Sequence, residues 1–224
     1  MKIVASEVTR KFRVGSAEVV AVDHANLEIG APEFVAVVGP SGSGKSTLLN
    51  MLGLNDSPTS GKILVDGVDA ASMSNVSRRK MRLLRMGFVF QNFNLFPTLS
   101  ALENVELPMA LAGKPQELQR REAERLLLSV GLEKRASHRP KQLSLGEMQR
   151  VAIARALAND PEVVIADEPT GELDSKTAEG IIGLLVEVGK RRSKSVIVAT
   201  HDEKVVSVVD RTYMIRDGKL KLES

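Results

Sequence analysis

Gly39-Pro40-Ser41-Gly42-Ser43-Gly44-Lys45-Ser46 decides the fold, because it fits the pattern G-x-x-x-x-G-K-[ST]. Phe34–Val38 runs into it as an apolar, strand-like segment, and Ser46–Leu52 continues from it with a helical pattern. In this context the glycines let backbone N–H groups turn toward phosphate oxygens, and the start of the helix adds partial positive charge. We therefore expect Lys45 to reach the β- and γ-phosphates of a nucleotide and the Ser46 hydroxyl to ligate Mg²⁺. The correct flanks disfavour the alternative, a glycine-rich turn with a chance lysine.

Composition limits the class of protein. The chain has 224 residues, of which 43% are hydrophobic and 26% charged, as in an ordinary soluble domain. A net charge of +3 is too small to indicate a nucleic-acid partner, and without cysteine there are no disulfides or thiolate metal sites. Met1–Val4 resembles the start of a strand rather than a signal peptide, and no run approaches the ~18–20 apolar residues of a membrane span. Any membrane role must therefore come through a partner.

Strand-like runs alternate with helical patterns along the chain, which predicts an α/β fold with a mainly parallel sheet covered on both faces. The expected strands are Ile3–Thr9, Val19–Val22, Ala25–Ile29, Phe34–Val38, Lys62–Gly67, Gly87–Phe90, Val163–Ala166, Ser195–Ala199 and Thr212–Ile215. The expected helices include residues 74–86, Gln116–Val130 and Thr177–Lys190. Helical patterns dominate from about 98 to 158, which predicts a helical subdomain inserted into the sheet domain.

Two acidic residues, Asp167 and Glu168, follow the apolar run Val163–Ala166. Ligands of open α/β sheets bind at the carboxyl ends of the strands, where these carboxylates would lie. One acid can hold Mg²⁺ and the other can act as a general base toward water. An isolated pair of acids would favour the alternative of a solvated strand end, but a phosphate-binding loop in the same sheet favours the catalytic interpretation.

Several further motifs complete a resemblance to the ATP-binding-cassette (ABC) ATPases. Leu143–Leu157, which reads LSLGEMQRVAIARAL, resembles the signature segment of that family, and it precedes the acidic strand by a short connection. Gln91 resembles the Q-loop glutamine, Glu172–Asp174 resembles the D-loop, and His201 resembles the switch histidine. Phe12 occupies the place of an adenine-stacking aromatic ring, although it could also be a plain core residue. The motifs keep the family's order over essentially the whole chain.

The resemblance implies the ABC ATPase fold in a single domain, residues 1–224. That fold has a P-loop nucleotidase core with a mainly parallel sheet, an N-terminal antiparallel β region and an inserted helical subdomain. The core would comprise about 1–91 and 159–224, and the subdomain about 92–158. The variants Asp167–Asp174, Gln91–Leu95 and Thr98–Val105 are most similar to the branch of lipoprotein-releasing, macrolide-exporter and cell-division ATPases.

The family mechanism implies a role for each matching residue. Two copies would pair head to tail, and each ATP would face the Ser144–Gln149 segment of the other copy. Glu168 would be the general base, His201 would contact the γ-phosphate, and Asp174 would line the interface between the copies. Gln91 would touch Mg²⁺ and the attacking water, and would relay the state of the site to the helical region.

The cofactors implied are ATP and Mg²⁺. The nucleotide would be bound by Phe12, Gly39, Pro40, Ser41, Gly42, Ser43, Gly44, Lys45, Ser46, Thr47, Ser144, Gly146 and Glu147. The metal would be held by Ser46, Gln91 and Asp167. Leu145 departs from the family pattern, which has glycine there, and it could either point away from the nucleotide or crowd it.

Residues outside these motifs receive plain interpretations. His24 and His138 match no motif, so we expect them at the surface or in local hydrogen bonds. The basic run Arg78–Arg82 could contact nucleic acid or lipid headgroups, but a solvated helix face is the simpler interpretation.

Two classes of function are compatible with the motifs. The first is the ATPase subunit of a transport or mechanotransmission complex, bound at the cytoplasmic face of the membrane to a transmembrane permease subunit on a separate chain. The second is a soluble ABC ATPase that acts on nucleic acid or ribosomes. The exporter-like variants favour the first, without a nucleic-acid partner. In the family, a groove between the P-loop core and the helical subdomain receives a short helix of the membrane subunit. Here Phe93, Leu95, Phe96, Leu99 and Leu102 would line it, with the alternative that they pack inside the helical subdomain, as some of them must.

Overall fold

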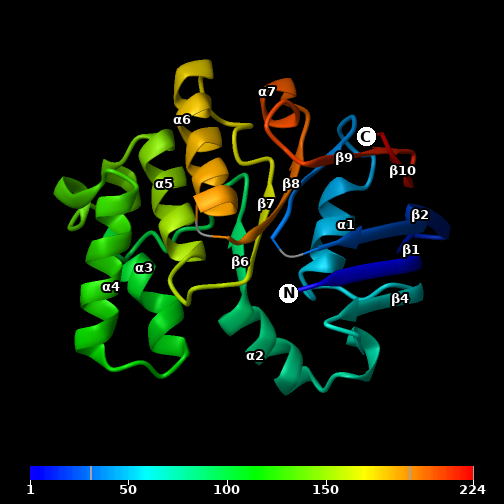
Figure 1. Cartoon of the computed structure of the whole chain (residues 1–224), viewed down its shortest axis with the longest axis horizontal. Helices are drawn as coiled ribbons and strands as arrows, with labels where there is room; N and C mark the ends of the chain where they lie inside the picture. The colour runs from blue at the N-terminus through cyan, green and yellow to red at the C-terminus, as the bar shows by residue number, and fades with distance from the viewer. Residues whose placement is uncertain (31, 192, 224) are drawn as a thin grey trace.

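Two sheets and a layer of helices make up the molecule (Figure 1). The computed structural model describes residues 1–30, 32–191 and 193–223. The larger sheet contains β3 (Phe34–Val38), β6 (Met86–Val89), β7 (Val163–Asp167), β8 (Ser195–Thr200), β9 (Arg211–Arg216) and β10 (Lys219–Leu222). Its order is β10-β9-β3-β8-β7-β6, and every pair is parallel except β9 with β10. The predicted mainly parallel sheet is therefore confirmed.

The smaller sheet is antiparallel, in the order β2-β1-β4-β5. It contains β1 (Ile3–Val14), β2 (Ala17–Ile29), β4 (Ser60–Val65) and β5 (Val68–Asp69). The expectation of short separate runs at Val19–Val22 and Ala25–Ile29 was wrong, because both belong to one long strand. His24 has a φ of 46°, and the β1/β2 register shifts nearby, so the strand absorbs an irregular residue without ending.

Helices flank the larger sheet. They are α1 (Lys45–Leu52), α2 (Asn75–Arg85), α3 (Ala101–Leu111), α4 (Gln116–Ser129), α5 (Leu145–Ala156), α6 (Ser175–Val186) and the short α7 (Glu203–Val206). Single 3₁₀ turns lie at Ala70–Ser72, Glu133–Arg135 and Pro140–Gln142, and a π-helical turn at Glu187–Arg191. Figure 1 shows α3, α4 and α5 side by side, away from the antiparallel sheet. Among the residues that the structure describes, no helix combines the length and apolar character needed to span a lipid bilayer.

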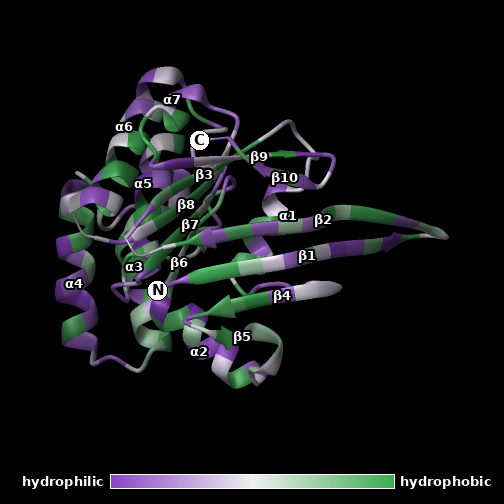
Figure 2. Ribbon diagram, turned by 45° about the vertical axis from the view of Figure 1, so that its right-hand side comes forward, coloured by the Kyte–Doolittle hydropathy of each residue, from purple (hydrophilic) through white to green (hydrophobic). Residues whose placement is uncertain are grey.

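The hydrophobic core has two parts, one on each face of the larger sheet. On β3, Phe34, Ala36 and Val38 face the cluster formed with α3–α6, while Val35 and Val37 face the cluster beneath the antiparallel sheet. The apolar ribbons of β3, β7 and β8 lie at the centre in Figure 2. This alternation explains why the central strands are continuous apolar runs: both faces are buried. Packing on both faces also holds the carboxyl ends of these strands in place, and the candidate site lies at those ends.

Candidate active site

The phosphate-type loop wraps around the side chain of Lys45. Lys45 Nζ donates hydrogen bonds to the carbonyls of Gly39 (2.8 Å) and Pro40 (3.1 Å), and the side chain is almost completely buried. Gly44 has a φ of 108°, and a Cβ built there would lie 2.1 Å from the carbonyl oxygen of Ala21. Only glycine fits that position. The loop then enters α1, whose first N–H groups form a favourable site for an anion.

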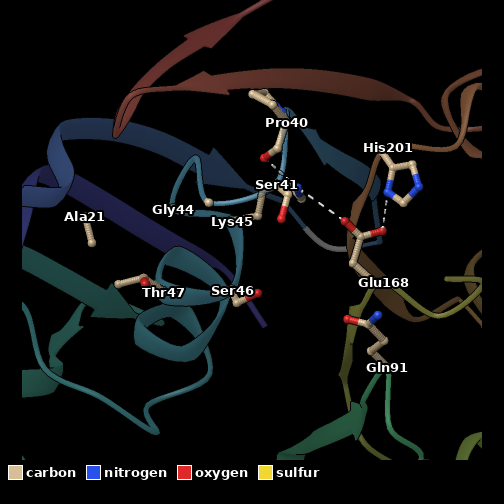
Figure 3. Close-up of a pocket in the computed structure, with 11 residues that line it drawn as sticks. Ala21, Pro40, Ser41, Gly44, Lys45, Ser46, Thr47, Gln91, Glu168 and His201 are labelled. Carbon is tan, nitrogen blue, oxygen red and sulfur yellow. Dashed lines mark hydrogen bonds and ion pairs between the residues drawn. The ribbon is translucent and has the colours of Figure 1, made fainter. Parts of the chain in front are cut away.

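Glu168 joins the loop to the opposite wall of the site. One carboxylate oxygen, Oε1, lies 3.2 Å from Lys45 Nζ, and the other, Oε2, lies 2.9 Å from His201 Nδ1. Figure 3 shows these contacts spanning the site from the loop to the end of β8. The backbone of Glu168 has a φ of 45°, an uncommon conformation for a residue with a side chain, and its N–H donates to the carbonyl of Ala199 (2.9 Å). A strained backbone at this point is typical of a functional site.

A cavity of about 560 Å³ opens beside this cluster. The predicted site residues that line it are Pro40, Ser41, Gly42, Gly44, Lys45, Ser46, Thr47, Gln91, Glu168 and His201. The predicted residues that do not line it are Phe12, Gly39, Ser43, Ser144, Gly146, Glu147 and Asp167. Gly39 still contributes the carbonyl that accepts from Lys45, and Ser43 is buried inside the loop.

Asp167 lies behind the cavity at the end of β7. Burial raises the pKa of its carboxyl and the nearby charge of Glu168 raises it further, whereas the Ser46 hydroxyl and the charge of Lys45 lower it. Its Oδ1 is buried and finds no hydrogen-bond partner among the described residues. Within the described residues, no group of three or more His, Cys, Asp or Glu side chains could hold a metal. A metal at this site would therefore rely on hydroxyl, carboxylate and ligand oxygens, which is the donor set that suits Mg²⁺.

Gln91 reaches across the site to the loop that follows β7. Its side chain lines the cavity, and its Nε2 donates to Glu172 Oε1 (3.1 Å). Gln91 follows β6, whereas Glu172 precedes α6, so this bond joins two segments at the same edge of the sheet. A displacement of one loop would therefore alter the hydrogen bond that holds the other.

The signature segment is ordered around the start of α5, away from the cavity of its own chain. Ser144 caps the helix: its Oγ accepts from the Glu147 N–H (3.2 Å), and Glu147 Oε2 accepts from the Ser144 N–H (2.8 Å). Arg135 Nε also donates to Glu147 (2.9 Å). A Cβ on Gly146 would lie 2.3 Å from Thr177 Cγ2, so this glycine is needed for packing against α6.

Leu145 is the first residue of α5, and 48% of it is exposed. It therefore faces outward and does not fill the core of its own chain. Glu147, in contrast, has both carboxylate oxygens engaged within its own chain.

Phe12 lies on the β1/β2 hairpin, opposite Val19, and is 38% exposed. The guanidinium of Arg10 lies 4.7 Å from its ring centroid. The ring is thus not a core residue, and it already stacks against a cation. His24 and His138 form local contacts, with Asp23 Oδ1 (2.7 Å) and with an Arg135 nitrogen (3.2 Å) respectively, as expected.

Three residues have roles at the site that the sequence did not predict, although Glu172 and Gln149 lie inside the D-loop and signature segments. Ala21 lines the cavity through a strand of the other sheet, Glu172 holds Gln91, and the buried Gln149 donates from α5 to the carbonyl of Pro169 (2.8 Å). The position of Gln149 inside the signature run was a usable signal. Nothing in the local sequence marks Ala21, since its role depends on how the two sheets pack.

A second cavity, of about 370 Å³, lies between β6, α2 and α3, and we call it the α2/α3 groove. Its apolar wall comes from Leu83, Phe88, Phe90, Phe96, Leu107, Pro108 and Leu111. Of the five residues expected at the docking groove only Phe96 lines this cavity, and the alternative of packing inside the helical layer holds for Phe93 and Leu102. Phe93 and Leu102 are buried, because the chain after Gln91 folds them onto the helical core. Phe96 remains 51% exposed at the groove.

The fold and the site together define a P-loop nucleotidase with an inserted helical layer. The sequence model of the family described as "ABC transporter" matches residues 22–171. Over 96% of its length the chain is 44% identical to the lipoprotein-releasing system ATP-binding protein LolD of Granulibacter bethesdensis, covering 93% of that protein. It is 47% identical, also over 96%, to the macrolide export ATP-binding/permease protein MacB of Burkholderia pseudomallei, of which it covers 33%.

The structure agrees with these similarities. The dimeric ATP-binding cassette MJ0796 of Methanocaldococcus jannaschii, in a post-hydrolysis state bound to ADP and Pi, superposes with a TM-score of 0.93 at 42% identity, covering 99% of this chain and 98% of that one. The chain therefore belongs to the ABC transporter family, as one of its ATP-binding, ATP-hydrolysing subunits, and the ABC ATPase fold predicted from the motifs is confirmed.

Proposed function

We propose that this ATPase works as a head-to-tail pair of copies at the cytoplasmic face of a membrane, where it drives a permease subunit on a separate chain. The observation that best supports the chemistry is the convergence of Lys45, Glu168 and His201 beside the phosphate loop. The relatives support the transport role, since LolD is named for a lipoprotein-releasing system and MacB for macrolide export.

The proposed hydrolysis begins with an exchange of partners by Lys45. Its ammonium leaves the carbonyls of Gly39 and Pro40 and the carboxylate of Glu168 to contact the β- and γ-phosphate oxygens. Glu168, thus released, accepts a proton from water while the water oxygen bonds to the γ-phosphorus. The bond from that phosphorus to the bridging oxygen breaks, and ADP and inorganic phosphate leave. His201, whose Nδ1 lies 2.9 Å from Glu168 Oε2 in the structure, would contact the same phosphate.

Mg²⁺ fits the residues present. Within the part of the chain that the structure describes, the buried Asp167 Oδ1 has no hydrogen-bond partner, and Ser46 and Gln91 line the adjacent cavity. These three residues would hold the ion, directly or through water. When bound, Mg²⁺ would neutralise charge on the phosphates.

The signature segment supports pairing of two copies. Ser144 and Gly146 do not line their own chain's cavity, and Ser144 and Leu145 are exposed at the N-terminus of α5. In a head-to-tail pair the signature segment of one copy would meet the γ-phosphate held by the other copy. Phe12 would lie at the adenine, and Asp174 would line the interface between the copies. That the similar cassette MJ0796 is dimeric supports the pairing of two copies. Hydrolysis would remove the charge that holds the copies together.

The α2/α3 groove is the proposed docking site for the permease subunit. It lies where the chain passes from β6 into residues 92–158, the proposed helical subdomain, and Gln91 stands at that junction. Movement of the subdomain relative to the phosphate loop would thus transmit the state of the nucleotide to the membrane.

Copurification from detergent-solubilised membranes tests the transport role. A polytopic membrane protein should copurify with the chain, and Phe96→Ser should abolish this while ATP binding persists. Leu128→Ser is the matched control, because Leu128 is an exposed leucine of α4 that does not line the groove. Copurification with ribosomes instead would favour the alternative, a soluble ABC ATPase acting on the translation machinery. Normal copurification of Phe96→Ser would place the docking site elsewhere.

A further inference from the structure

The α2/α3 groove carries positive charge that the fold does not neutralise. Arg79, Arg82 and Arg155 line it next to the aromatic wall, and its remaining polar lining comes from asparagines. Across the described ranges, no carboxylate lines the groove or forms an ion pair with any of these three arginines. Three cations beside an apolar wall are an unusual surface for a chain with a net charge of only +3.

The other two arginines of α2 have structural roles: Arg85 is neutralised by carboxylates, whereas Arg78 anchors the helix through uncharged acceptors. Arg85 pairs with Glu162 and with Asp66. Arg78 donates to Ser57 Oγ (2.8 Å) and to the carbonyl of Ala70 (3.0 Å), which ties α2 to the preceding loop. Arg78 and Arg85 thus already attach α2 to the rest of the protein. Attachment of the helix therefore does not explain the presence of Arg79.

The three groove arginines are only partly engaged. Arg82 donates to the carbonyl of Leu54 (2.8 Å), and Arg155 donates to the carbonyl of Phe93 (2.8 Å). Burial lowers the pKa of both guanidinium groups, and for Arg82 the charges of Arg78 and Arg79 lower it further. Arg79 is exposed, and no hydrogen bond from its side chain is recorded within the described residues. Carbonyl partners leave the positive charge itself unbalanced.

We propose that the groove selects a permease segment that carries a carboxylate side chain beside its apolar anchors. This inference rests on the proposed docking function of the groove. The apolar anchors would cover Phe96 and Leu111, which are 51% and 68% exposed. Covering them removes water from the arginines, so an occupant must supply negative charge or leave buried cations unpaired. A carboxylate matches the planar guanidinium fork, whereas a basic segment is repelled.

Photocross-linking directly identifies the segment that occupies the α2/α3 groove and the residues it contains. p-Benzoylphenylalanine replaces Phe96 in the full chain, the complex with its membrane subunit is irradiated, and the cross-linked peptide is sequenced by mass spectrometry. We expect a peptide of the membrane subunit with Asp or Glu within about one helical turn, three or four residues, of the cross-link. A cross-linked peptide without a carboxylate there, or an adduct with phospholipid, overturns the proposal.

Charge reversal provides the second arm. Arg79→Glu should reduce recovery of the membrane subunit by about tenfold or more, and replacing the identified carboxylate with arginine should restore it. Lys80→Glu is the control, since it makes the same charge change on an exposed residue of α2 that does not line the groove. Equal loss in Lys80→Glu, or no rescue by the reciprocal change, overturns the proposal. If Arg79→Glu fails to fold, as judged by circular dichroism, Arg79→Gln is used, and undiminished recovery then overturns it.

The two hypotheses fail differently. If the unmodified chain recovers no membrane subunit, the proposed docking function fails and the charge inference fails with it. If the unmodified chain and Arg79→Glu recover the subunit equally, docking stands and only the carboxylate requirement is lost.

Discussion

Glu168→Gln separates the chemistry of the site from its ability to bind nucleotide. The substitution keeps the size and shape of the side chain, removes its negative charge and leaves an amide that is a poor proton acceptor. In the structure the lost charge is the one that holds Lys45 Nζ at 3.2 Å and His201 Nδ1 at 2.9 Å. The loss of the proton acceptor and the release of Lys45 and His201 thus both follow from changing one nearly buried carboxylate.

The expected size of each effect can be estimated. A positioned general base contributes about 10²–10⁴-fold to rate, so turnover should fall by that factor. That corresponds to roughly 3–5 kcal/mol on the barrier. Lys45 must leave its carboxylate partner before it reaches phosphate, and a hydrogen bond to a charged group is worth about 1.5–3 kcal/mol. Without that competitor, ATP should bind the variant at least as tightly as the parent.

Two assays measure these effects: phosphate release under saturating Mg²⁺–ATP, and ATP affinity by isothermal titration calorimetry. Glu179→Gln is the matched control, since Glu179 pairs with Lys204 at the surface and should leave both quantities unchanged. Parent-rate turnover in Glu168→Gln would refute the base assignment. Clearly weaker ATP binding would refute the proposed competition between carboxylate and phosphate for Lys45.

Three further predictions concern binding, pairing and acid stability. Lys45→Ala should weaken ATP binding itself, measured by the same titration, because it removes a charge-assisted contact to phosphate. Leu145→Gly should lower the ATP concentration needed for pairing in light scattering, because an exposed leucine at the start of α5 hinders close approach; weaker pairing would mean that the leucine packs productively on the other copy. Hydrogen bonds and charge from Arg85 and from the N-terminal ammonium of Met1 lower the pKa of Glu162 from about 4.5 to about 2, so this contribution to stability is complete above pH 4.5 and is lost as pH falls toward 2. Because Glu162 is substantially exposed, Glu162→Gln should cost only about 1 kcal/mol at pH 7 and flatten the acid limb of a pH–stability curve.

Much of the fold was predictable because its signals are local. The apolar runs before Gly39 and Asp167 marked the buried parallel strands, and Gly131 marked the end of α4 with its φ of 73°. β10 was missed although Asp217-Gly218 is a typical two-residue hairpin turn, with φ of 50° and 77°. The alternation of Lys219–Leu222 is a strand pattern, so that miss was avoidable.

Other features depend on tertiary contacts that no local pattern encodes. The motifs indicated which residues belong to the site, but not that Lys45 would pair with Glu168 or that Gln91 would bond Glu172. The apolar residues after Gln91 looked equivalent in the sequence, yet packing buries Phe93 and leaves Phe96 exposed. The basic run Arg78–Arg82 is evident in the sequence, but only the fold shows that α2 and α5 bring Arg79, Arg82 and Arg155 to one groove.

The central claim is that ATP completes an incomplete site by joining two copies. Size-exclusion chromatography with multi-angle light scattering on Glu168→Gln tests it most directly, because this variant should bind ATP and not consume it. Without nucleotide the mass should be near the 24.3 kDa of one chain, and with Mg²⁺–ATP it should be near twice that value. A dimer that persists without nucleotide, or a monomer at saturating Mg²⁺–ATP, would contradict the account.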